Sequence, residues 1–430
     1  MTDSVAPGSA LNTPTERMTR YRWVICWLLF MAVVINYVDR QILGIMRPLG
    51  LGDEMGWSER DYADIVFYFQ AAYTVAYLLF GAFIDKIGAK FGYAIAFAIW
   101  QIAHIAHAGA SNTAQFIVAR VALGVGEAGN FPAAVKAVTE WFPKKERAFA
   151  VGIFNAGANI GAVVTPLAVP AIMLAWGWQM AFIITGVIGL LWLPLWLLMY
   201  RKPEVHPKVN AAELAHIQSD PADDVRKAGW FKVTSKRETW AFAFAKFLTD
   251  PVWWMLLFWA PSFFKQTYEM STAQFAIVLA VVYLISDAGS IAGGWLSSNF
   301  LKRGMSLNKA RKLALFIISL FALPFLALVH IENMWVSMLL VGLVAAAHQA
   351  FSANLLTLPS DVFPRKAVGS VIGIGGMLGG IGGMIMAKGV GEALSTTLGY
   401  EAVFAVCAFV YLIALGVIHI LTPKYEPADV

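Results

Sequence analysis

Four charged residues lie within long apolar segments of this chain, and their spacing indicates which of them can interact. Asp39 and Arg40 are adjacent, whereas Arg120 and Glu127 are seven residues apart. Ionisable groups are costly inside a lipid bilayer, so residues of this kind in an apolar segment usually serve a function. Adjacent residues on a helix point about 100° apart, so Asp39 and Arg40 should face different partners.

Helix geometry predicts how these charges pair. Arg120 and Glu127 lie on nearly one helix face but about 10 Å apart along the axis, which is too far for a direct ion pair. Arg120 therefore needs a carboxylate from another helix, and Asp39 is the best candidate. Arg40 is then left as a fixed cation whose planar guanidinium suits both oxygens of a ligand carboxylate. The alternative is a permanent buried network of all four that only fixes the fold.

Further polar residues lie in apolar segments of the second half of the chain, and each has two interpretations. Lys246 and Asp250 are four residues apart, so they either satisfy each other or face a ligand. Asp287 is an alternative partner for Lys246. His348 and Gln349 are expected to bind hydroxyl groups, although a histidine satisfied within the core is almost as good an interpretation of His348.

Several chemical functions are disfavoured by what the sequence lacks. The two cysteines, Cys26 and Cys407, lie in apolar runs and are expected to pack there rather than to form a disulfide. No role is assigned to His104 and His107. No nucleophile with a nearby base, metal-ligand cluster or phosphate-binding loop is visible, so an enzyme is not expected, and neither is a metal or cofactor.

The composition requires lipid around most of these residues. Of 430 residues, 59% are hydrophobic and 14% are charged, and the mean hydropathy is +0.65. Soluble domains carry about 25% charged residues. A membrane-spanning helix needs about 20 apolar residues, and continuous runs of that length exclude a β-barrel. The chain is therefore predicted to be an all-α membrane protein with twelve transmembrane helices: 23–46, 61–84, 91–110, 113–136, 148–174, 178–200, 240–264, 272–298, 311–330, 333–357, 367–391 and 399–421.

The distribution of basic residues predicts the orientation in the membrane. With both termini inside, the inner segments hold 24 of the Lys and Arg residues and the outer loops hold four. The net charge of +5 then reflects membrane topology and gives no reason to expect nucleic-acid binding. The chain is predicted to begin with a cytoplasmic tail (1–22) and a six-helix bundle (23–200). A cytoplasmic linker (201–239), too short for a signalling domain, leads to a second six-helix bundle (240–421) and a short cytoplasmic tail (422–430).

The two halves repeat each other in sequence. The segment 139–145 (TEWFPKK) follows the fourth predicted helix, and 360–366 (SDVFPRK) follows the tenth. Gly152 and Gly373 come after these segments at equal distances. Two similar six-helix halves in one orientation predict a cavity between them and alternating access by rocking of the halves.

These features resemble the major facilitator superfamily and, within it, the anion:cation symporter family. The matching segments include a loop motif at 81–90 (GAFIDKIGAK), NYVDR at 36–40, RVALGVGEA at 120–128 and EWFP at 140–143. Stretches at 246–254 (KFLTDPVWW) and 348–352 (HQAFS) are most similar to bacterial hexuronate transporters. The resemblance implies a proton-coupled importer of glucuronate or galacturonate in the bacterial inner membrane, functional as a monomer. Symport or exchange of another carboxylated solute, such as galactonate or gluconate, is the alternative.

The resemblance also implies roles for particular residues. Tyr73 matches a substrate-facing tyrosine, and Ala158 and Gly376 replace two polar residues of galactonate carriers. Together with the charges above, it gives three predicted sets. The substrate-binding set is Arg40, Tyr73, Asn155, Asn159, Lys246, Trp253, His348 and Gln349. The proton-coupling set is Asp39, Arg120 and Glu127, with Glu127 expected to protonate readily because no cation lies one turn away. The gating motif is Gly81, Asp85, Lys86 and Lys90.

Overall fold

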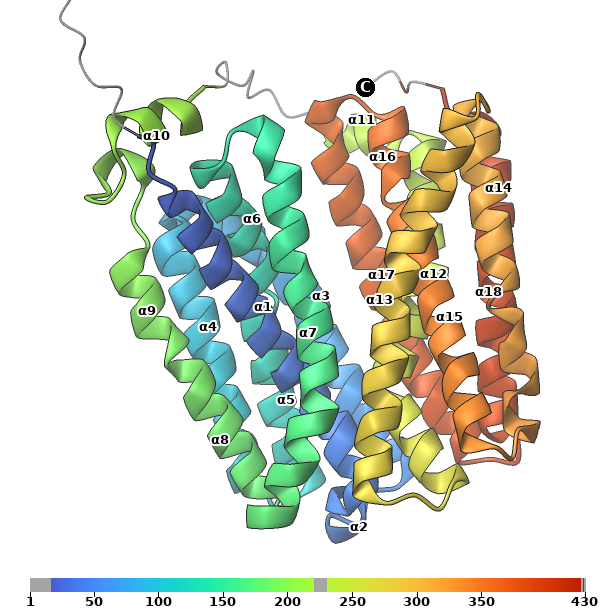
Figure 1. The fold of residues 1–430 in the computed structure, drawn as a ribbon. Coiled ribbons are helices and arrows are strands. Elements are labelled where there is room, and N and C mark those ends of the chain that lie inside the picture. The colour runs from blue at the N-terminus through green and yellow to red at the C-terminus, as the bar shows by residue number, and fades with distance from the viewer. Residues whose placement is uncertain (1–16, 220–229, 427, 429–430) are drawn as a thin grey trace, which may run out of the picture.

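The computed structural model describes residues 17–219, 230–426 and 428, and all regular structure in these residues is helical (Figure 1). The helices form two side-by-side bundles. The first contains α1 (Tyr21–Met46), η1 (Arg47–Leu49), α2 (Leu51–Glu54), α3 (Glu59–Ile87), α4 (Ala89–Ala106), η2 (His107–Gly109), α5 (Thr113–Glu127), α6 (Asn130–Trp141), α7 (Lys144–Trp176), α8 (Trp178–Leu190) and α9 (Trp192–Met199).

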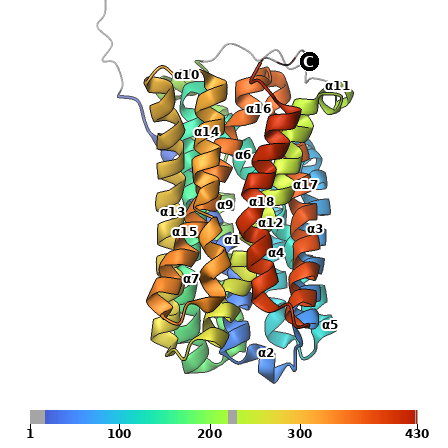
Figure 2. The same ribbon diagram turned by 90° about the vertical axis from the view of Figure 1, so that its right-hand side faces the viewer.

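A linker with three short helices leads to the second bundle. The linker helices are η3 (Pro203–Val205), α10 (Ala211–Ile217) and α11 (Trp230–Thr234). The second bundle contains α12 (Arg237–Thr267), α13 (Thr272–Lys302), α14 (Leu307–Leu320), η4 (Leu323–His330), α15 (Met334–Leu355), α16 (Thr357–Val362), α17 (Arg365–Leu394) and α18 (Gly399–Leu421). Figure 2 shows α10, α11 and α16 at one end of the molecule and α2 at the other. We call these the linker end and the α2 end.

The predicted all-helical membrane class is confirmed, with one change in the helices. Among the described residues, eleven segments are helical, long and apolar enough to cross a membrane. The fourth predicted helix, 113–136, is divided into α5 and α6 between Glu127 and Asn130. The chain there lies very close to α4, because a Cβ atom on Gly126 would come within 2.4 Å of the Trp100 backbone nitrogen. Only glycine, which has no Cβ atom, allows the two backbones to come this close.

The two bundles meet along α3 and α17, and this seam is tight only towards the α2 end. A Cβ atom on Gly380 would lie 2.3 Å from Thr74 Oγ1, and one on Gly391 would lie 2.3 Å from the Cβ of Ala63. Further towards the linker end, a Cβ on Gly376 or Gly373 would meet nothing within 4 Å. The seam therefore opens between Gly380 and Gly376.

Polar contacts between the bundles are distributed along the seam in the same way as the close packing. Within the part of the chain that the structure describes, every hydrogen bond or ion pair joining the bundles lies towards the α2 end. Arg60 forms two hydrogen bonds with Glu392, at 3.0 and 2.9 Å, and Lys388 pairs with Asp64. The Tyr62 hydroxyl donates to the carbonyl of Phe258 at 3.0 Å. This conformation is thus closed at the α2 end.

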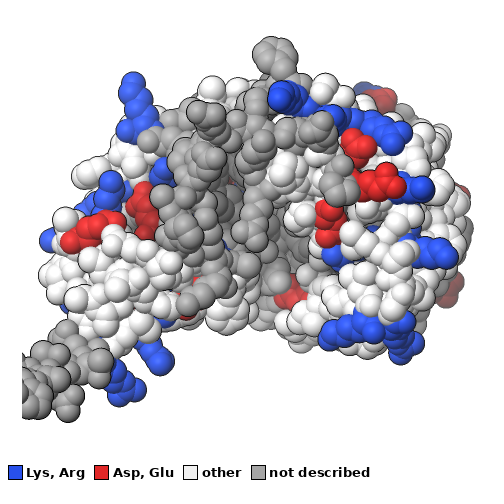
Figure 3. All heavy atoms as spheres, turned by 90° about the horizontal axis from the view of Figure 1, so that it is seen from above, with Lys and Arg blue, Asp and Glu red and all other residues white. Residues whose placement is uncertain are grey.

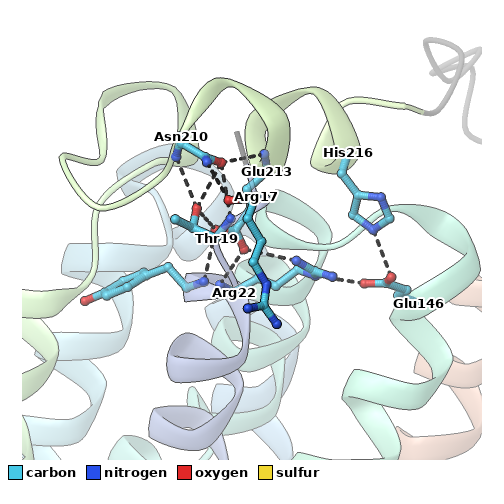
Figure 4. Close-up of polar contacts among 8 residues, drawn as sticks. Arg17, Thr19, Arg22, Glu146, Asn210, Glu213 and His216 are labelled. Atoms are coloured by element: carbon cyan, nitrogen blue, oxygen red, sulfur yellow. Dashed lines mark hydrogen bonds and ion pairs between the residues drawn. The ribbon is translucent and has the colours of Figure 1, made fainter. Parts of the chain in front are cut away.

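The linker end carries many of the basic side chains. Figure 3 views the molecule from this end and shows Lys and Arg gathered around its rim. The helical linker segment α10 is held against the first bundle by a buried carboxylate, that of Glu213 (Figure 4). Its two oxygens accept hydrogen bonds from the Thr19 hydroxyl at 2.6 Å, the backbone N–H groups of Tyr21 and Arg22 at 3.0 and 3.1 Å, and Arg22 Nη1 at 3.1 Å.

These bonds make Glu213 a cap for α1 supplied by another segment. The first N–H groups of a helix lack intrahelical partners and favour negative charge. The residue before α1, Arg20, forms no side-chain cap, so Glu213 supplies it. Arg22 also donates from Nε to Glu146 at 2.9 Å, and His216 Nε2 lies 2.8 Å from the other oxygen of Glu146. We call Thr19, Arg22, Glu146, Glu213 and His216 the linker clamp, since they tie α10 to α1 and α7.

Candidate functional site

The central feature of the candidate site is an ion pair between Arg40 of α1 and Glu127 at the end of α5. Both Nε and Nη2 of Arg40 lie 2.8 Å from the same oxygen, Glu127 Oε2. The side chains are 3% and 0% exposed, and Glu127 Oε1 has no hydrogen-bond partner. The expectation that Glu127 has no nearby cation is therefore wrong, as is the expectation that Arg40 is left free. The partner comes from another helix, which spacing within α5 does not reveal.

Four aromatic rings surround the guanidinium of Arg40. The Cζ atom lies 4.8 Å from the ring centre of Tyr73, 5.3 Å from Trp254, 5.4 Å from Tyr37 and 5.8 Å from Phe69. Aromatic faces attract cations, and more strongly where water is excluded. The cage joins both bundles, because Trp254 belongs to α12 and the other rings belong to α1 and α3.

A cavity of about 170 Å³ adjoins this cage and is lined from both bundles. Tyr73 and Trp254 belong to the cage and to the cavity wall. The remaining lining residues are Thr74, Tyr77, Phe131, Asp250, Gly376, Met377 and Gly380. A ligand here would contact both bundles and lie beside the only arginine in the cage.

Lys246 is paired within its own helix. Its Nζ lies 2.7 Å from Oδ2 of Asp250, one turn further along α12, and the two side chains are 15% and 18% exposed. The interpretation in which these residues satisfy each other is confirmed, and the alternative pair of Lys246 with Asp287 is wrong. Asp287 forms no hydrogen bond or ion pair with any described residue. Lys246 is partly neutralised before any ligand arrives, although Asp250 reaches the cavity wall.

His348 takes part in core packing. Its Nδ1 lies 3.0 Å from the Tyr411 hydroxyl, and its ring stacks on Trp253 with centroids 5.5 Å apart and planes 13° apart. Only 4% of His348 is exposed. These contacts favour the interpretation of His348 as a core residue, and they occupy one face of the Trp253 ring.

Three predicted ligand contacts keep free hydrogen-bonding groups. Asn155 is exposed, and Asn159 and Gln349 are half-buried. None of these amides forms a hydrogen bond to a described residue. They therefore stay candidates for binding hydroxyl groups.

Asp39 is bound by α4 rather than by Arg120. Its Oδ2 accepts hydrogen bonds from Trp100 Nε1 at 2.8 Å and Gln101 Nε2 at 2.7 Å, and its Oδ1 lies 3.3 Å from His104 Nε2. The predicted pair with Arg120 is wrong because neutral N–H donors occupy the carboxylate. Arg120 Nη1 donates instead to the carbonyl of Arg40, at 3.4 Å.

Arg120 is consequently a buried cation without an ion-pair partner among the described residues. It is 1% exposed, and no carboxylate oxygen of a described residue lies within 4.0 Å of it. Its Nε and Nη2 have no hydrogen-bond partners. Such a group is strained electrostatically and favours negative charge nearby.

Sequence reasoning missed the residues that hold Asp39, although a signal was present. Trp100, Gln101 and His104 are polar or donor-bearing residues within one apolar run, and positions 100 and 104 share a helix face. Glycines on α8 leave room for them: a Cβ on Gly189 would lie 2.5 Å from Gln101 Nε2, and one on Gly186 would lie 3.1 Å from His104 Cδ2. His104, to which no role was assigned, thus lies beside the Asp39 carboxylate, away from the residues that line the cavity.

The gating motif stays a prediction. A Cβ on Gly81 would meet nothing within 4 Å, and the Lys86 side chain is exposed at the linker end of α3. The backbone carbonyl of Lys90 accepts a hydrogen bond from Trp196 Nε1 at 2.9 Å. The side chain of Asp85 lies outside the described residues, so its contacts with the basic residues are untested.

Comparison with known proteins identifies the family. The profile of the Major Facilitator Superfamily matches residues 29–387 and, in an overlapping match, residues 305–429. The chain is 32% identical over 403 residues to the hexuronate transporter of Escherichia coli (strain K12), covering 92% of this chain and 93% of that protein. It is 31% identical over 323 residues to the galacturonate transporter of Dickeya chrysanthemi, covering 71% and 93%. The D-galactonate transporter of Escherichia coli O6:H1 is 28% identical over 419 residues, covering 94% and 95%.

Solved structures support the fold. A bacterial homologue of the human lysosomal transporter Spinster, crystallised in an inward-facing and occupied conformation, superimposes with a TM-score of 0.70 at 18% identity, over 95% of this chain and 96% of that chain. At this identity the likeness concerns the fold alone. The helical bundles, the matching profile and the relatives together establish that this chain belongs to the major facilitator superfamily and is a multi-pass membrane transporter rather than an enzyme.

Proposed function

We propose that this protein imports a hexuronate, glucuronate or galacturonate, together with protons by alternating access. The observation that carries the proposal is the Arg40–Glu127 pair, enclosed by aromatic rings beside a cavity that both bundles line. A guanidinium in such a place suits a substrate carboxylate, because its planar fork matches two carboxylate oxygens. The hexuronate transporters among the relatives support the choice of substrate class.

Competition for Arg40 supplies the coupling. Glu127 and the substrate carboxylate are both anions, and one buried guanidinium binds them alternately. Protonation of Glu127 removes its charge and weakens its bond to Arg40, which frees the guanidinium for the substrate. The substrate then crosses as an anion accompanied by at least one proton. In this scheme Glu127 is the coupling residue beside the aromatic cage, and Arg40 binds the two carboxylates in turn.

Rocking of the bundles about this site moves it from one side of the membrane to the other. The seam is closed at the α2 end and open from Gly376 towards the linker end. The excess of basic residues in the segments at the linker end supports a cytoplasmic position for that end and both tails. The conformation described here is then the one that releases substrate inward, and the site opens outward when the α3–α17 seam parts.

A second candidate is another sugar acid, carried by symport or by exchange. Relatives include transporters of D-galactonate and, as a probable function, of galactarate and D-glucarate. Ala158 and Gly376 stand where galactonate carriers place polar side chains, which argues against galactonate. Gly376 lines the cavity, so the polar contact is lost where it would matter.

The deciding experiment is uptake into proteoliposomes with an imposed pH gradient. Glucuronate, galacturonate, gluconate, galactonate and a neutral hexose should be compared under the same gradient. Accumulation of a hexuronate above the others, dependent on an acidic outside, is expected. Comparable uptake of the neutral hexose, or accumulation indifferent to the gradient, would sink the proposal.

A further inference from the structure

The carboxylate of Asp39 contacts only groups from the interior of the first bundle. The Asp39 side chain is 0% exposed, whereas the neighbouring Arg40 faces the aromatic cage. Among the described residues, the three polar contacts of the Asp39 carboxylate come from α4: Trp100, Gln101 and His104. Of these three, only histidine gains and loses a proton near neutral pH. His104 is therefore the one of these three neighbours that can exchange a proton with Asp39.

The hydrogen bonds around His104 determine which of its ring nitrogens carries a proton. The Thr185 hydroxyl donates to the carbonyl of Ala181 at 2.7 Å and lies 2.8 Å from His104 Nε2. A hydroxyl has one proton, so towards the histidine it must accept. Nε2 is therefore protonated and donates to Thr185 Oγ1, and Asp39 Oδ1, which has no hydrogen-bond partner of its own, lies 3.3 Å from the same nitrogen. The other nitrogen, Nδ1, is buried and has no hydrogen-bond partner.

We propose that His104 is the group through which Asp39 gains and loses its proton. This inference rests on the proposed proton-coupled function and adds a residue to it. A proton binds at Nδ1, the N–H bond at Nε2 breaks, and an O–H bond forms at Asp39 Oδ1. His104 ends as the neutral Nδ1–H form, and its Nε2 now accepts a hydrogen bond from the new carboxylic acid. One proton is consumed, Asp39 loses its charge, and the reverse sequence releases the proton.

The neighbouring charges connect this exchange to the rest of the site. Arg120 and Glu127 of α5 act electrostatically on Asp39, and Arg120 also acts on His104. α8 contributes Thr185 but has no ionisable residue. His107 lies with its ring centre 6.3 Å from that of His104, and its Nδ1 is bonded to the carbonyl of Ala103 at 2.8 Å. Protonating Asp39 thus removes a negative charge close to Arg120, the buried cation that has no carboxylate within 4.0 Å.

The test compares His104→Gln with His107→Gln in proteoliposomes. A glutamine amide at position 104 still offers an N–H group to Asp39 and Thr185 but does not relay a proton. Three quantities are measured: counterflow of labelled glucuronate without a gradient, accumulation of glucuronate driven by a pH gradient, and proton influx reported by a pH-sensitive dye inside the vesicles. Thermal unfolding in detergent checks that each variant folds.

The expected result is a separation of the two activities in one variant. His104→Gln should keep counterflow within about twofold of the wild type, while accumulation and proton influx fall on the order of tenfold or more, as for loss of a positioned proton-transfer group. His107→Gln should behave as the wild type, because its ring contacts a backbone carbonyl and not the carboxylate.

Each other outcome has a distinct meaning. Normal accumulation and proton influx in folded His104→Gln would overturn the role of His104 while leaving the proposed function intact. Parallel loss of counterflow and accumulation in that variant would also overturn it, because only a packing role predicts both. Failure of the wild type itself to accumulate glucuronate with protons would overturn the proposed function, and this inference with it.

Discussion

Two buried Arg–Glu contacts made by residues of α1, Arg22 with Glu213 and Arg40 with Glu127, are built in opposite ways. In the linker clamp, the two oxygens of Glu213 receive four hydrogen bonds, from Thr19, Tyr21 and Arg22. At the candidate site, Arg40 directs two nitrogens to one oxygen of Glu127 and leaves the other oxygen without a partner. Both carboxylates are 0% exposed, so burial alone does not distinguish them.

The difference lies in how completely the hydrogen-bonding capacity is used. A buried polar network in which every atom has a partner holds one arrangement, whereas unpaired atoms lower the cost of exchanging partners. Around the Arg40 site, the side-chain amides of Asn36, Gln41 and Gln70 and the guanidinium of Arg120 are buried and incompletely bonded. The clamp is therefore expected to move as one piece with the first bundle, and the site to change its bonds during transport.

The largest effect should come from Arg40→Lys. The substitution keeps the charge but loses the planar fork and its fit among the aromatic rings. Transport of glucuronate should fall about 100-fold or more, in line with the cost of disrupting a buried charge pair. The matched change in the clamp, Arg22→Lys, should leave initial uptake rates within about twofold. Equal losses in both variants would contradict the distinction between site and clamp.

The next largest effect separates exchange from coupling. Glu127→Gln should still exchange substrate across the membrane but lose accumulation driven by a pH gradient, because it has no charge to gain or lose. Glu213→Gln should keep accumulation and instead lose about 1–3 kcal/mol of stability, since donors to the carboxylate are left poorly bonded. Counterflow, gradient-driven uptake and thermal unfolding on both proteins are the measurements. Undiminished accumulation in Glu127→Gln would remove this glutamate from the coupling scheme.

A smaller effect is expected at the unpaired amides. Alanine at Asn155, Asn159 or Gln349 should weaken apparent substrate affinity by roughly 5- to 100-fold where the amide contacts the sugar. His348→Ala should act mainly on stability, because His348 is bonded to Tyr411 and stacked on Trp253. Concentration dependence of uptake separates the two classes. If all three amide variants bind as the wild type does, the sugar lies elsewhere.

The smallest expected effect is a loss of protein stability at acidic pH that comes from the carboxylates of the linker clamp. Burial alone would raise the pKa of Glu213, but the bonds from Thr19, Tyr21 and Arg22 hold it below its ordinary value. For Glu146, the bonds from His216 and Arg22 likewise outweigh burial and lower the pKa. A carboxyl pKa lowered by folding stabilises the protein above its unfolded value, about 4.3, and this stabilisation is lost as pH falls through the folded value.

Thermal unfolding between pH 7 and pH 3 checks this prediction. The wild-type melting temperature should be nearly level down to about pH 5 and then fall. Glu213→Gln should start lower and fall less steeply, because one of the titrating groups is absent. Parallel curves for the two proteins would show that Glu213 does not contribute to the acid dependence.

The sequence predicted the positions of the helices better than the side-chain contacts between them. Apolar runs located the helices well, because a run of about 20 residues has few alternatives in lipid. The predicted helix at 113–136 is two helices, since the glycines that let α5 and α6 approach α4 also interrupt the regular pattern. One of the two interpretations of Lys246 and Asp250, that they pair with each other, was correct because both lie on one helix, one turn apart.

Pairing between helices was not predictable in the same way. Asp39 was expected to pair with Arg120, but it accepts hydrogen bonds from Trp100 and Gln101 and lies beside His104. Arg40, expected to be free, found Glu127 across the bundle. Rotation of one helix by a single residue would exchange such partners, and sequence spacing carries no information about the relative rotation of two helices.

The glycine seam between α3 and α17 bears on the speed of the transport cycle. Interlocked side chains must withdraw and change rotamer before two surfaces separate, and each such step adds to the barrier. Gly380 and Gly391 instead place the α17 backbone directly against Thr74 and Ala63 of α3. Surfaces that meet on glycine part without any side chain to withdraw. Much of the resistance to opening at the α2 end then comes from exposed ion pairs there, Arg60–Glu392 and Lys388–Asp64, whose strength depends on the salt concentration of the solution at that end.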